Sequence, residues 1–169
     1  MRSGTRTEVK RRWTPCGHRP CCKIRIGYEY TYLYAALNPY DGHLIALLLP
    51  TMQKVCFEVF MDYFAEQVAL KHGTARALLI ADGAASHQMD AIKSDTVDMV
   101  RLPRACPELN PAERFFQALR PQMSNQVFET IEQVEDHLCV ILKQYFEQPA
   151  VVMSLASFPG AFHFFALVP

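Results

Sequence analysis

The chain lacks the features that mark repeat, fibrous and multidomain proteins. Its 169 residues contain no internal repeat and no low-complexity tract, and its 7 glycines and 11 prolines do not gather into a linker. Apolar residues make up 50% of the chain and charged residues 20%, which is an ordinary globular composition. A chain of this length buries roughly two thirds of its unfolded surface, so it can form one hydrophobic core.

The chain also lacks a secretory signal and a regular cysteine framework. We therefore expect free thiols in a reducing, cytoplasmic environment for the six cysteines, which are Cys16, Cys21, Cys22, Cys56, Cys106 and Cys139. The group formed by Cys16, His18, Cys21 and Cys22 has no second ligand pair at zinc-finger spacing. Adjacent cysteines would also strain a tetrahedral site, so we expect no zinc there.

Asp, Glu, Lys and Arg are missing from Gln148 to the C-terminus. Ser154, Pro159 and Gly160 interrupt this apolar stretch, so a membrane-spanning helix is not expected. Residues 148–169 are instead interpreted as an apolar C-terminal tail that packs on the core or meets a partner surface. We expect no membrane association.

The net charge of zero hides an asymmetry. Residues 1–25 hold eight basic residues and one acid, a local charge of +7 that the rest of the chain balances. Clustered Lys and Arg bind polyanions by displacing condensed counterions, which makes nucleic acid the first candidate partner of this basic N-terminal arm. A charged segment that is merely solvated remains the alternative.

The hydrophobic pattern predicts an α/β domain with a mixed sheet flanked by helices, over residues 26–147. Thr51 is the expected N-cap of the first helix and Gly73 its end. Four strands are fewer than such a sheet usually has, and one strand looks missing. The predicted strands are 30–38, 43–50, 75–82 and 97–103; the predicted helices are 51–73, one starting at 111 and one at about 130–146, with a helical turn at 90–93.

Two acids occupy positions that suit either structure or chemistry. Asp82 ends an apolar strand, where it can open an Asp-Gly turn or contribute to a ligand site. Glu113 follows Asn110 and Pro111, which fit the N-cap and first position of a helix, so Glu113 can complete a capping box. Capping and metal binding are compatible, because a helix N-terminus favours negative charge.

A pair of carboxylates at one sheet edge would suit a hard divalent cation. Mg²⁺ binds one or two carboxylates together with substrate phosphate oxygens, and two such ions can clamp the oxygens of a phosphodiester displacement. A centre of that kind normally needs at least three acids.

Two stretches, "LLIADGAASH" and "VRLPRACPELNPAERFFQALR", resemble the catalytic core of DDE transposases from bacterial insertion sequences related to mariner elements. "RRWTPCGHRP" and "YLYAALNPYDG" extend the similarity over about residues 6–157. The resemblance implies a ribonuclease H-like fold, DNA as partner, Mg²⁺ or Mn²⁺ as cofactor, and phosphodiester cleavage followed by strand transfer. It makes Asp82 and Glu113 the second and third metal ligands.

Other residues are assigned DNA-binding or accessory roles. Lys10, Arg11, Arg12 and Arg19 are assigned to DNA phosphates, which give affinity without sequence choice. His87 either lies beside the metal or ends a turn, and Asn110 is an accessory candidate beside Glu113.

The chain departs from the family pattern at its start. Family members carry a first catalytic Asp at the end of a strand just before the basic stretch, and here that position would precede Met1. We therefore expect a truncated domain without its first strand; Asp41 is a poor substitute because the family places no ligand there. The alternatives are a non-catalytic remnant that only binds DNA or a partner chain, a chain completed by a separately encoded N-terminal segment, and a homo-oligomer.

Overall fold

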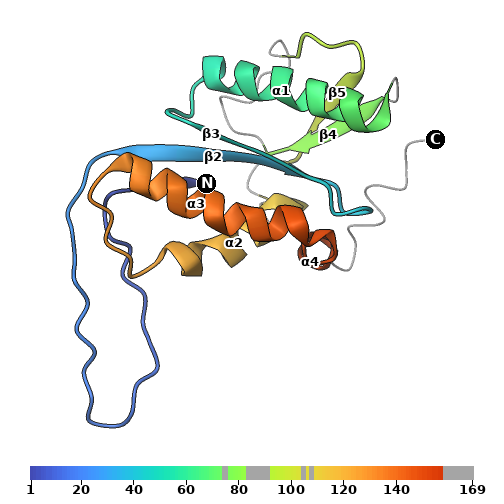
Figure 1. Cartoon of the computed structure of the whole chain (residues 1–169). Helices are drawn as coiled ribbons and strands as arrows, with labels where there is room; N and C mark the ends of the chain where they lie inside the picture. The colour runs from blue at the N-terminus through green and yellow to red at the C-terminus, as the bar shows by residue number, and fades with distance from the viewer. Residues whose placement is uncertain (74–75, 83–91, 104–105, 107–108, 158–169) are drawn as a thin grey trace.

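A computed structural model describes residues 1–73, 76–82, 92–103, 106 and 109–157. Within them, strands and helices form layers, with two small sheets between helix α1 on one side and helices α2, α3 and α4 on the other (Figure 1). The strands are β1 (Arg2–Gly4), β2 (Tyr30–Leu37), β3 (Leu44–Leu49), β4 (Ala77–Ala81) and β5 (Val97–Arg101). The α/β prediction is confirmed.

The first sheet has the order β1-β2-β3 and is antiparallel throughout. β2 and β3 form the predicted hairpin, in which Tyr32 lies opposite Leu49 and Leu37 lies opposite Leu44. Gly42 has a φ of 69° in the connecting turn, a backbone conformation that glycine adopts without steric cost. The sequence pattern predicts no strand in residues 1–25, whereas the structure places the short β1 there, opposite Tyr30–Tyr32.

The second sheet consists of β4 and β5, which pair in parallel from Ala77 opposite Val97 to Ala81 opposite Arg101. Both strands were predicted from their apolar pattern, and both are shorter than the predicted ranges. The single mixed sheet of the prediction is therefore two hydrogen-bonded sheets among the described residues, with β2 and β4 as the neighbouring edges.

Helix α1 (Lys54–His72) begins after Gln53, so the prediction that Thr51 caps it is wrong. The Thr51 hydroxyl lies 3.1 Å from the Cys56 sulfur instead. The predicted end is confirmed, because Gly73 closes the helix with a φ of 64° and donates its N–H to the Ala69 carbonyl. Lys54 begins a helix of 19 residues.

Helices α2 (Pro111–Met123), α3 (Ile131–Glu147) and α4 (Pro149–Ala156) form the opposite layer. α2 continues through Pro121, and α4 lies at the beginning of the predicted C-terminal tail. Val152 and Ala156 of α4 are fully buried, so this part of the tail packs on the core as one of the two predicted alternatives requires. None of the helices in the described residues is long and apolar enough to cross a membrane.

The two faces of β2 supply two separate hydrophobic clusters. Tyr34 packs with α1, where its ring centroid lies 5.5 Å from that of Phe60. Leu33 packs on the other face with α2 and α3, against Phe115 and Leu138. Alternate side chains of one strand thus serve both helical layers, which requires a strand that is apolar on both faces.

Residues 5–29 form a long arm that projects away from the helices and sheets (Figure 1). It includes most of the basic segment predicted at residues 1–25, and from here on "the arm" means residues 5–29. Its base is held by backbone hydrogen bonds from Thr5 to Glu29 and from Thr7 to Arg25. Thr5 is 1% exposed, whereas Trp13 farther along the arm is fully exposed. The division into arm, core and tail at residues 25 and 147 stays a prediction.

Candidate catalytic edge

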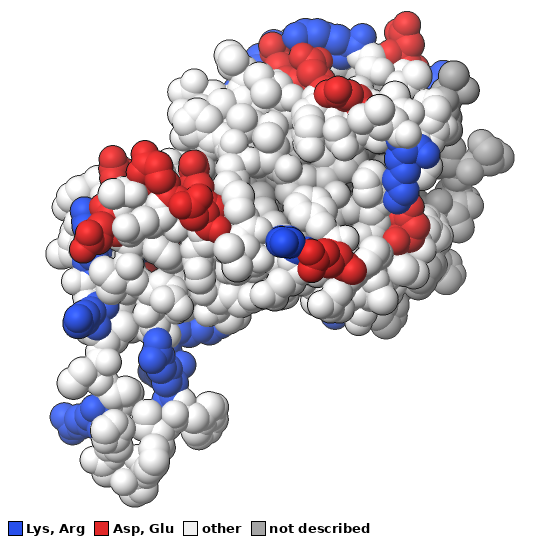
Figure 2. Space-filling model, in the orientation of Figure 1, with Lys and Arg blue, Asp and Glu red and all other residues white. Residues whose placement is uncertain are grey.

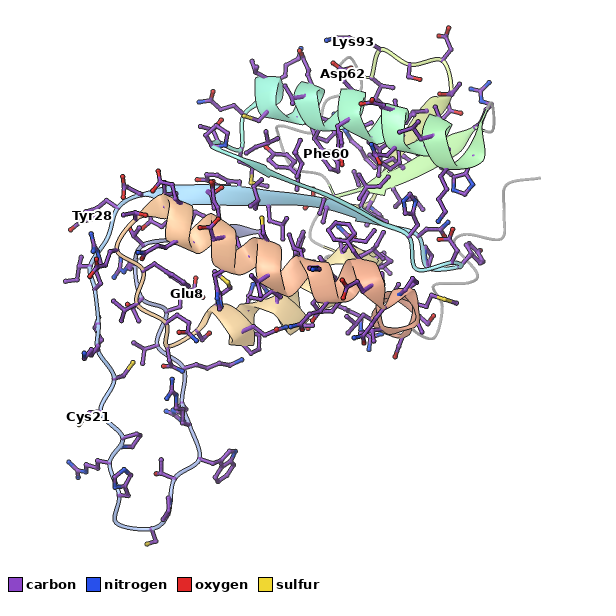
Figure 3. All side chains as sticks on the ribbon, in the orientation of Figure 1. Glu8, Cys21, Tyr28, Phe60, Asp62 and Lys93 are labelled. Carbon is purple, nitrogen blue, oxygen red and sulfur yellow. The ribbon has the colours of Figure 1, made fainter. Side chains whose placement is uncertain are left out.

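A cavity of about 690 Å³ lies between the neighbouring edges of β2 and β4. Leu33 to Asn38 line one side, and Ala77 to Asp82 line the other. Phe60 reaches the cavity from α1 (Figure 3), and Phe116 reaches it from α2. The cavity is thus bounded by two strand edges and two helical layers, and we call it the strand slot.

Asp82 and Glu113 both line one end of the strand slot. Asp82 follows the last residue of β4, and Glu113 lies in the first turn of α2. Local sequence explains the second placement. Asn110 accepts a hydrogen bond from the Ala112 N–H at 3.0 Å, and Pro111 occupies the start of the helix, as predicted.

The amino group of Met1 lies at the same end of the slot. It donates a hydrogen bond of 2.6 Å to the Leu33 carbonyl, and the Leu33 N–H donates one of 2.8 Å to the Met1 carbonyl. Burial lowers the pKa of the Met1 amine to about 6; Glu113 and Asp82 act in the opposite direction, and Arg120 adds to the lowering. Asp82 and Glu113 are thus both near enough to this amine to influence its pKa.

Arg120 is a site residue that the sequence pattern does not single out. Its guanidinium lies 3.6 Å from the Glu113 carboxylate, with the two side chains 46% and 30% exposed. The two residues are seven positions apart, two helical turns, so they lie on one face of α2. The sequence signal that could have identified Arg120 is a basic residue seven positions after a candidate acid, on the same face of a predicted helix.

The chemical type of the side chains at this edge suits a divalent cation. Asp82 and Glu113 supply carboxylate oxygens, which Mg²⁺ and Mn²⁺ prefer. They fall short in number, because the described residues contain no group of three or more His, Cys, Asp or Glu side chains that could hold a metal. A third carboxylate has to come from elsewhere for a complete three-acid centre, and Met1 lies beside the two acids instead.

The basic residues assigned to DNA are on the arm, apart from the strand slot. Lys10, Arg11, Arg12 and Arg19 are exposed, and within the described part of the chain none of them forms an ion pair. Figure 2 shows Lys and Arg side chains spread along the projecting arm, whereas acidic side chains lie on the body. The arm is therefore available to an anionic partner.

Asn125 fixes the base of the arm to the end of α2. Its N–H donates to the Glu8 carbonyl at 2.7 Å, and its side-chain oxygen accepts from the Lys10 N–H at 3.1 Å. Asn125 has a φ of 60°, a conformation in which asparagine is favoured among non-glycine residues. An Asn directly after a helix was the sequence signal for this contact.

Several predicted features fall elsewhere. His87 and residues 90–91 of the predicted turn at 90–93 lie outside the described residues. The six cysteines are free, and Cys21 lies on the arm with its side chain exposed (Figure 3). Asp41 is bound to Lys71 at 2.7 Å, at the end of β2 away from Met1.

Comparison with known proteins identifies the family. Residues 1–135 match the family described as DDE superfamily endonuclease. An uncharacterized protein of Sinorhizobium fredii (strain NBRC 101917 / NGR234), y4pE/y4sA, is 30% identical over 128 residues, which are 75% of this chain and 93% of that protein.

Solved structures of Mos1 transposase share the fold at low sequence identity. The Mos1 mariner paired-end complex with Mn has a TM-score of 0.67 at 15% identity, and the alignment covers 92% of this chain and 51% of that one. The Mos1 paired-end complex with the left transposon end has a TM-score of 0.63 at 16% identity and covers 92% and 53%. The chain thus spans about half the length of these structures. Together with the family match over residues 1–135, they establish that the chain belongs to the DDE superfamily endonuclease family, with a ribonuclease H-like fold.

Proposed function

We propose that this chain is the catalytic-domain portion of a DNA transposase, which acts by metal-dependent phosphodiester cleavage and strand transfer. The observation that carries the proposal is the meeting of Asp82 and Glu113 at one end of the strand slot. These two acids come from a strand end and a helix start that are distant in sequence, and the family motifs contain both.

Asp82 and Glu113 would hold Mg²⁺ or Mn²⁺ once a third carboxylate joins them. A bound divalent cation would activate the attacking oxygen and neutralise charge on the phosphate. The protein's own contribution is to place the acids. Glu113 lies in the first turn of α2, an end of the helix where negative charge is favoured, and Arg120 adds a nearby positive charge.

DNA is the proposed partner, and the arm is its proposed binding surface. The similar Mos1 structures include a complex with a transposon end, which supports DNA as a partner of this chain too. Lys10, Arg11, Arg12 and Arg19 would contact phosphates and give affinity without base recognition. We accordingly propose that the protein is located in the bacterial cytoplasm, in association with the nucleoid. We also propose that it forms homo-oligomers.

A second candidate function is a non-catalytic remnant, and it is favoured because the described residues place two carboxylates at this edge but no group of three. Such a chain would bind DNA or a partner chain without cutting. This non-catalytic remnant keeps the arm as its functional part. The two candidates make opposite predictions for cleavage and the same prediction for binding.

A nicking assay separates the two candidates. The purified chain is incubated with supercoiled plasmid in Mg²⁺ or Mn²⁺. It is tested alone, with an apolar strand that ends in Asp fused before Met1, and with the same strand ending in Asn. The enzyme requires nicking that chelation abolishes and that Asp82→Asn and Glu113→Gln each reduce by roughly a hundredfold or more. Glu135→Gln, an acid on α3 outside the slot lining, is the matched control and should nick normally.

The outcomes are distinct. Nicking that survives both substitutions would identify a contaminating nuclease and reject Asp82 and Glu113 as the site. Binding without nicking, even in the fused chain, would support the remnant.

DNA binding through the arm has its own test. Replacing Lys10, Arg11, Arg12 and Arg19 together with alanine should weaken binding to unrelated DNA sequences equally. The slope of log affinity against log salt should become shallower by roughly one for each phosphate that these side chains neutralise. Lys143→Ala on α3 is the control, since this exposed lysine lies outside the arm. An unchanged salt slope in the arm variant would reject the arm as the binding surface.

A further inference from the structure

The outer edge of β3 is unpaired within the described part of the chain, where β2 is the one strand beside it. Leu33 of β2 exchanges both of its backbone hydrogen bonds with Met1, and not with Leu48, the residue opposite it on β3. Antiparallel strands alternate between residue pairs that exchange hydrogen bonds and pairs that do not. Every second residue of β3 therefore directs its backbone N–H and C=O away from β2. These outward-directed residues are Leu44, Ala46 and Leu48.

A cavity of about 240 Å³ lies along this edge, and we call it the β3 groove. Its lining comes from β3, from α1, and from the region where α3 ends and α4 begins. The residues are Leu44, Ile45 and Ala46 of β3, Tyr63, Gln67 and Lys71 of α1, and Phe146 and Pro149. In Figure 1, β3 accordingly lies between α1 and α3. Backbone groups without partners thus border a groove that has a helical layer on each side.

The side chains of β3 pack toward both helical layers. The cluster under α1 and the cluster of α2 and α3 each contain alternate residues of this strand. Ile45, Leu47 and Leu49 belong to the first cluster, and Leu44, Ala46 and Leu48 belong to the second. A further strand beside β3 would lie between the same layers, so it has to be apolar on both faces. A strand with one polar face would bury unpaired polar groups.

Apolar side chains are also exposed on both sides of the β3 groove. Val59, one helical turn before Tyr63 on α1, is 48% exposed, and Phe146 on α3 is 49% exposed. Figure 2 shows few charged side chains on the face between α1 and α3. The strand edge and these two side chains together form an apolar surface, and such surfaces mark sites of protein association.

β3 of a second copy meets the requirements that this edge sets. Its sequence, LIALLL, is apolar throughout, whereas β5 carries Asp98 and Arg101. A twofold axis through Ala46 would place Ala46 opposite Ala46 of the partner subunit and Leu44 opposite Leu48 of the partner subunit. The outward-directed N–H groups of each strand then meet carbonyl groups of the other. The edge is therefore complementary to itself.

Charges near the two ends of the β3 groove favour the same antiparallel arrangement. Lys71 binds Asp41, just before β3 begins. Phe146 lines the groove near this end as well, so α3 ends here and its first half lies toward the end of β3. That first half carries Glu132 and Glu135. An antiparallel second copy brings these acids toward the lysine end of its partner, which is the more favourable pairing of charges.

We propose that the β3 groove is the interface of a homodimer, in which the β3 strands of two copies pair edge to edge and antiparallel. Pairing joins the two three-stranded sheets into one continuous sheet and covers Val59 and Phe146. The inference goes beyond the proposed function because it names the surface through which copies associate. Asp82 and Glu113 lie outside the groove lining, so dimer formation and cleavage can succeed or fail separately.

Sedimentation of the whole 169-residue chain, at about 1 to 100 μM, tests the dimer. The Ala46 N–H faces away from β2, so Ala46→Pro removes a donor at the dimer axis and leaves the β2–β3 hydrogen bonds in place. We expect this substitution to raise the dissociation constant of the dimer roughly a hundredfold or more, because both copies lose the donor. Ala46→Ser keeps the N–H and a small side chain, so this control should dimerise normally.

Amide hydrogen exchange provides a second readout that needs no variant. Exchange at Leu44, Ala46 and Leu48 should slow roughly tenfold or more as the chain is concentrated from monomer to dimer, because these amides gain partners. The amides of Ile45 and Leu47 already face β2, so they should change less. This comparison decides the question even if Ala46→Pro does not fold.

Three results would overturn the proposal. The first is a monomer at every concentration. The second is a dimer that Ala46→Pro leaves intact but Trp13→Ala weakens, which would locate the interface on the arm, where Trp13 is exposed. The third is a monomer in which the amides of Leu44, Ala46 and Leu48 are already protected, because a segment of the same chain would then occupy the edge.

The dimer and the catalytic proposal have separate outcomes. If the chain dimerises through β3 but no fused form nicks plasmid, the interface stands and the catalytic proposal fails. If the fused chain nicks as predicted while it sediments as a monomer, the catalytic proposal stands and the interface fails. Asp82→Asn and Glu113→Gln should dimerise like the unchanged chain in either case.

Discussion

The two helical layers of this domain differ in how completely they are packed. In the layer of α2, α3 and α4, Phe115, Leu119, Val134 and Leu138 are all fully buried. In the α1 layer, the row of phenylalanines is also shielded from bulk solvent, but it borders the strand slot. The comparison teaches that, among the described residues, the cluster around Phe115 lies away from the slot, whereas the phenylalanines of α1 border it.

The largest expected effect is on stability, and it comes from replacing one phenylalanine in each layer with alanine. Phe115→Ala should lower the free energy of unfolding by about 3–5 kcal/mol, because it opens a cavity in a closed cluster. Phe60→Ala should cost clearly less, since this ring already borders open volume. Urea denaturation of the two variants measures the difference. Equal losses would mean that the α1 layer is as tightly packed as the other.

A pH effect of intermediate size belongs to the end of the strand slot. The Met1 amine has a pKa of about 6 in the folded chain because burial lowers it from 8.0. Between pH 8 and pH 6 the unfolded chain binds this proton and the folded chain does not, so stability should fall as the pH drops through this window, by at most about 2–3 kcal/mol. Chemical denaturation at both pH values measures the change.

Acetylation of the Met1 amine is the control for the pH effect. It removes this titration but leaves the histidines unchanged, so the acetylated chain should show a flatter pH dependence. Identical pH profiles for the free and acetylated chains would show that the Met1 amine is not buried at the end of the slot.

Enlarging a side chain, instead of shortening one, should also affect the stability of the two layers differently. Ala156→Val on α4 forces extra methyl groups into a filled site and should cost about 1–3 kcal/mol. Ala36→Val on β2 places the same groups beside the slot, and should change stability by less than about 1 kcal/mol. Thermal melts of both variants suffice, and a large loss at Ala36 would contradict the open volume there.

The smallest effect concerns the far end of the slot. Lys71 and Asp41 form an ion pair of 2.7 Å with side chains 38% and 37% exposed, and such pairs contribute about 0–1 kcal/mol. Asp41→Asn should therefore leave the melting temperature nearly unchanged. A substantial loss would show that this contact, rather than the hydrophobic clusters, holds the end of β2 against α1.

Local sequence was sufficient for the elements whose signals are local. The Asn110 cap, the Gly73 helix end and the β2–β3 hairpin are each specified by residues close in sequence. β1 was missed because a three-residue strand is recognisable only from its pairing with Tyr30–Tyr32, at the other end of the arm. Thr51 misled because its hydroxyl has a competing partner in Cys56.

The candidate site divides in the same way. Asp82 and Glu113 were identified through the family resemblance, and the structure brings them to one cavity. The Met1 amine and Arg120 could not be assigned to this edge from composition or spacing, because their proximity depends on how β1 and α2 pack against β2. Their roles, like those of the arm residues, stay predictions until the variants are measured.

Helix α2 carries Glu113 in its first turn, and Asn125, just beyond its last turn, holds the base of the arm. A helix of 13 residues is rigid and about 20 Å long. On a DNA duplex that length corresponds to roughly six base pairs. If the arm binds DNA phosphates, the length of α2 sets the distance between those phosphates and the phosphodiester bond that lies next to Glu113. Lengthening α2 by one turn would then move that bond by roughly one to two base pairs.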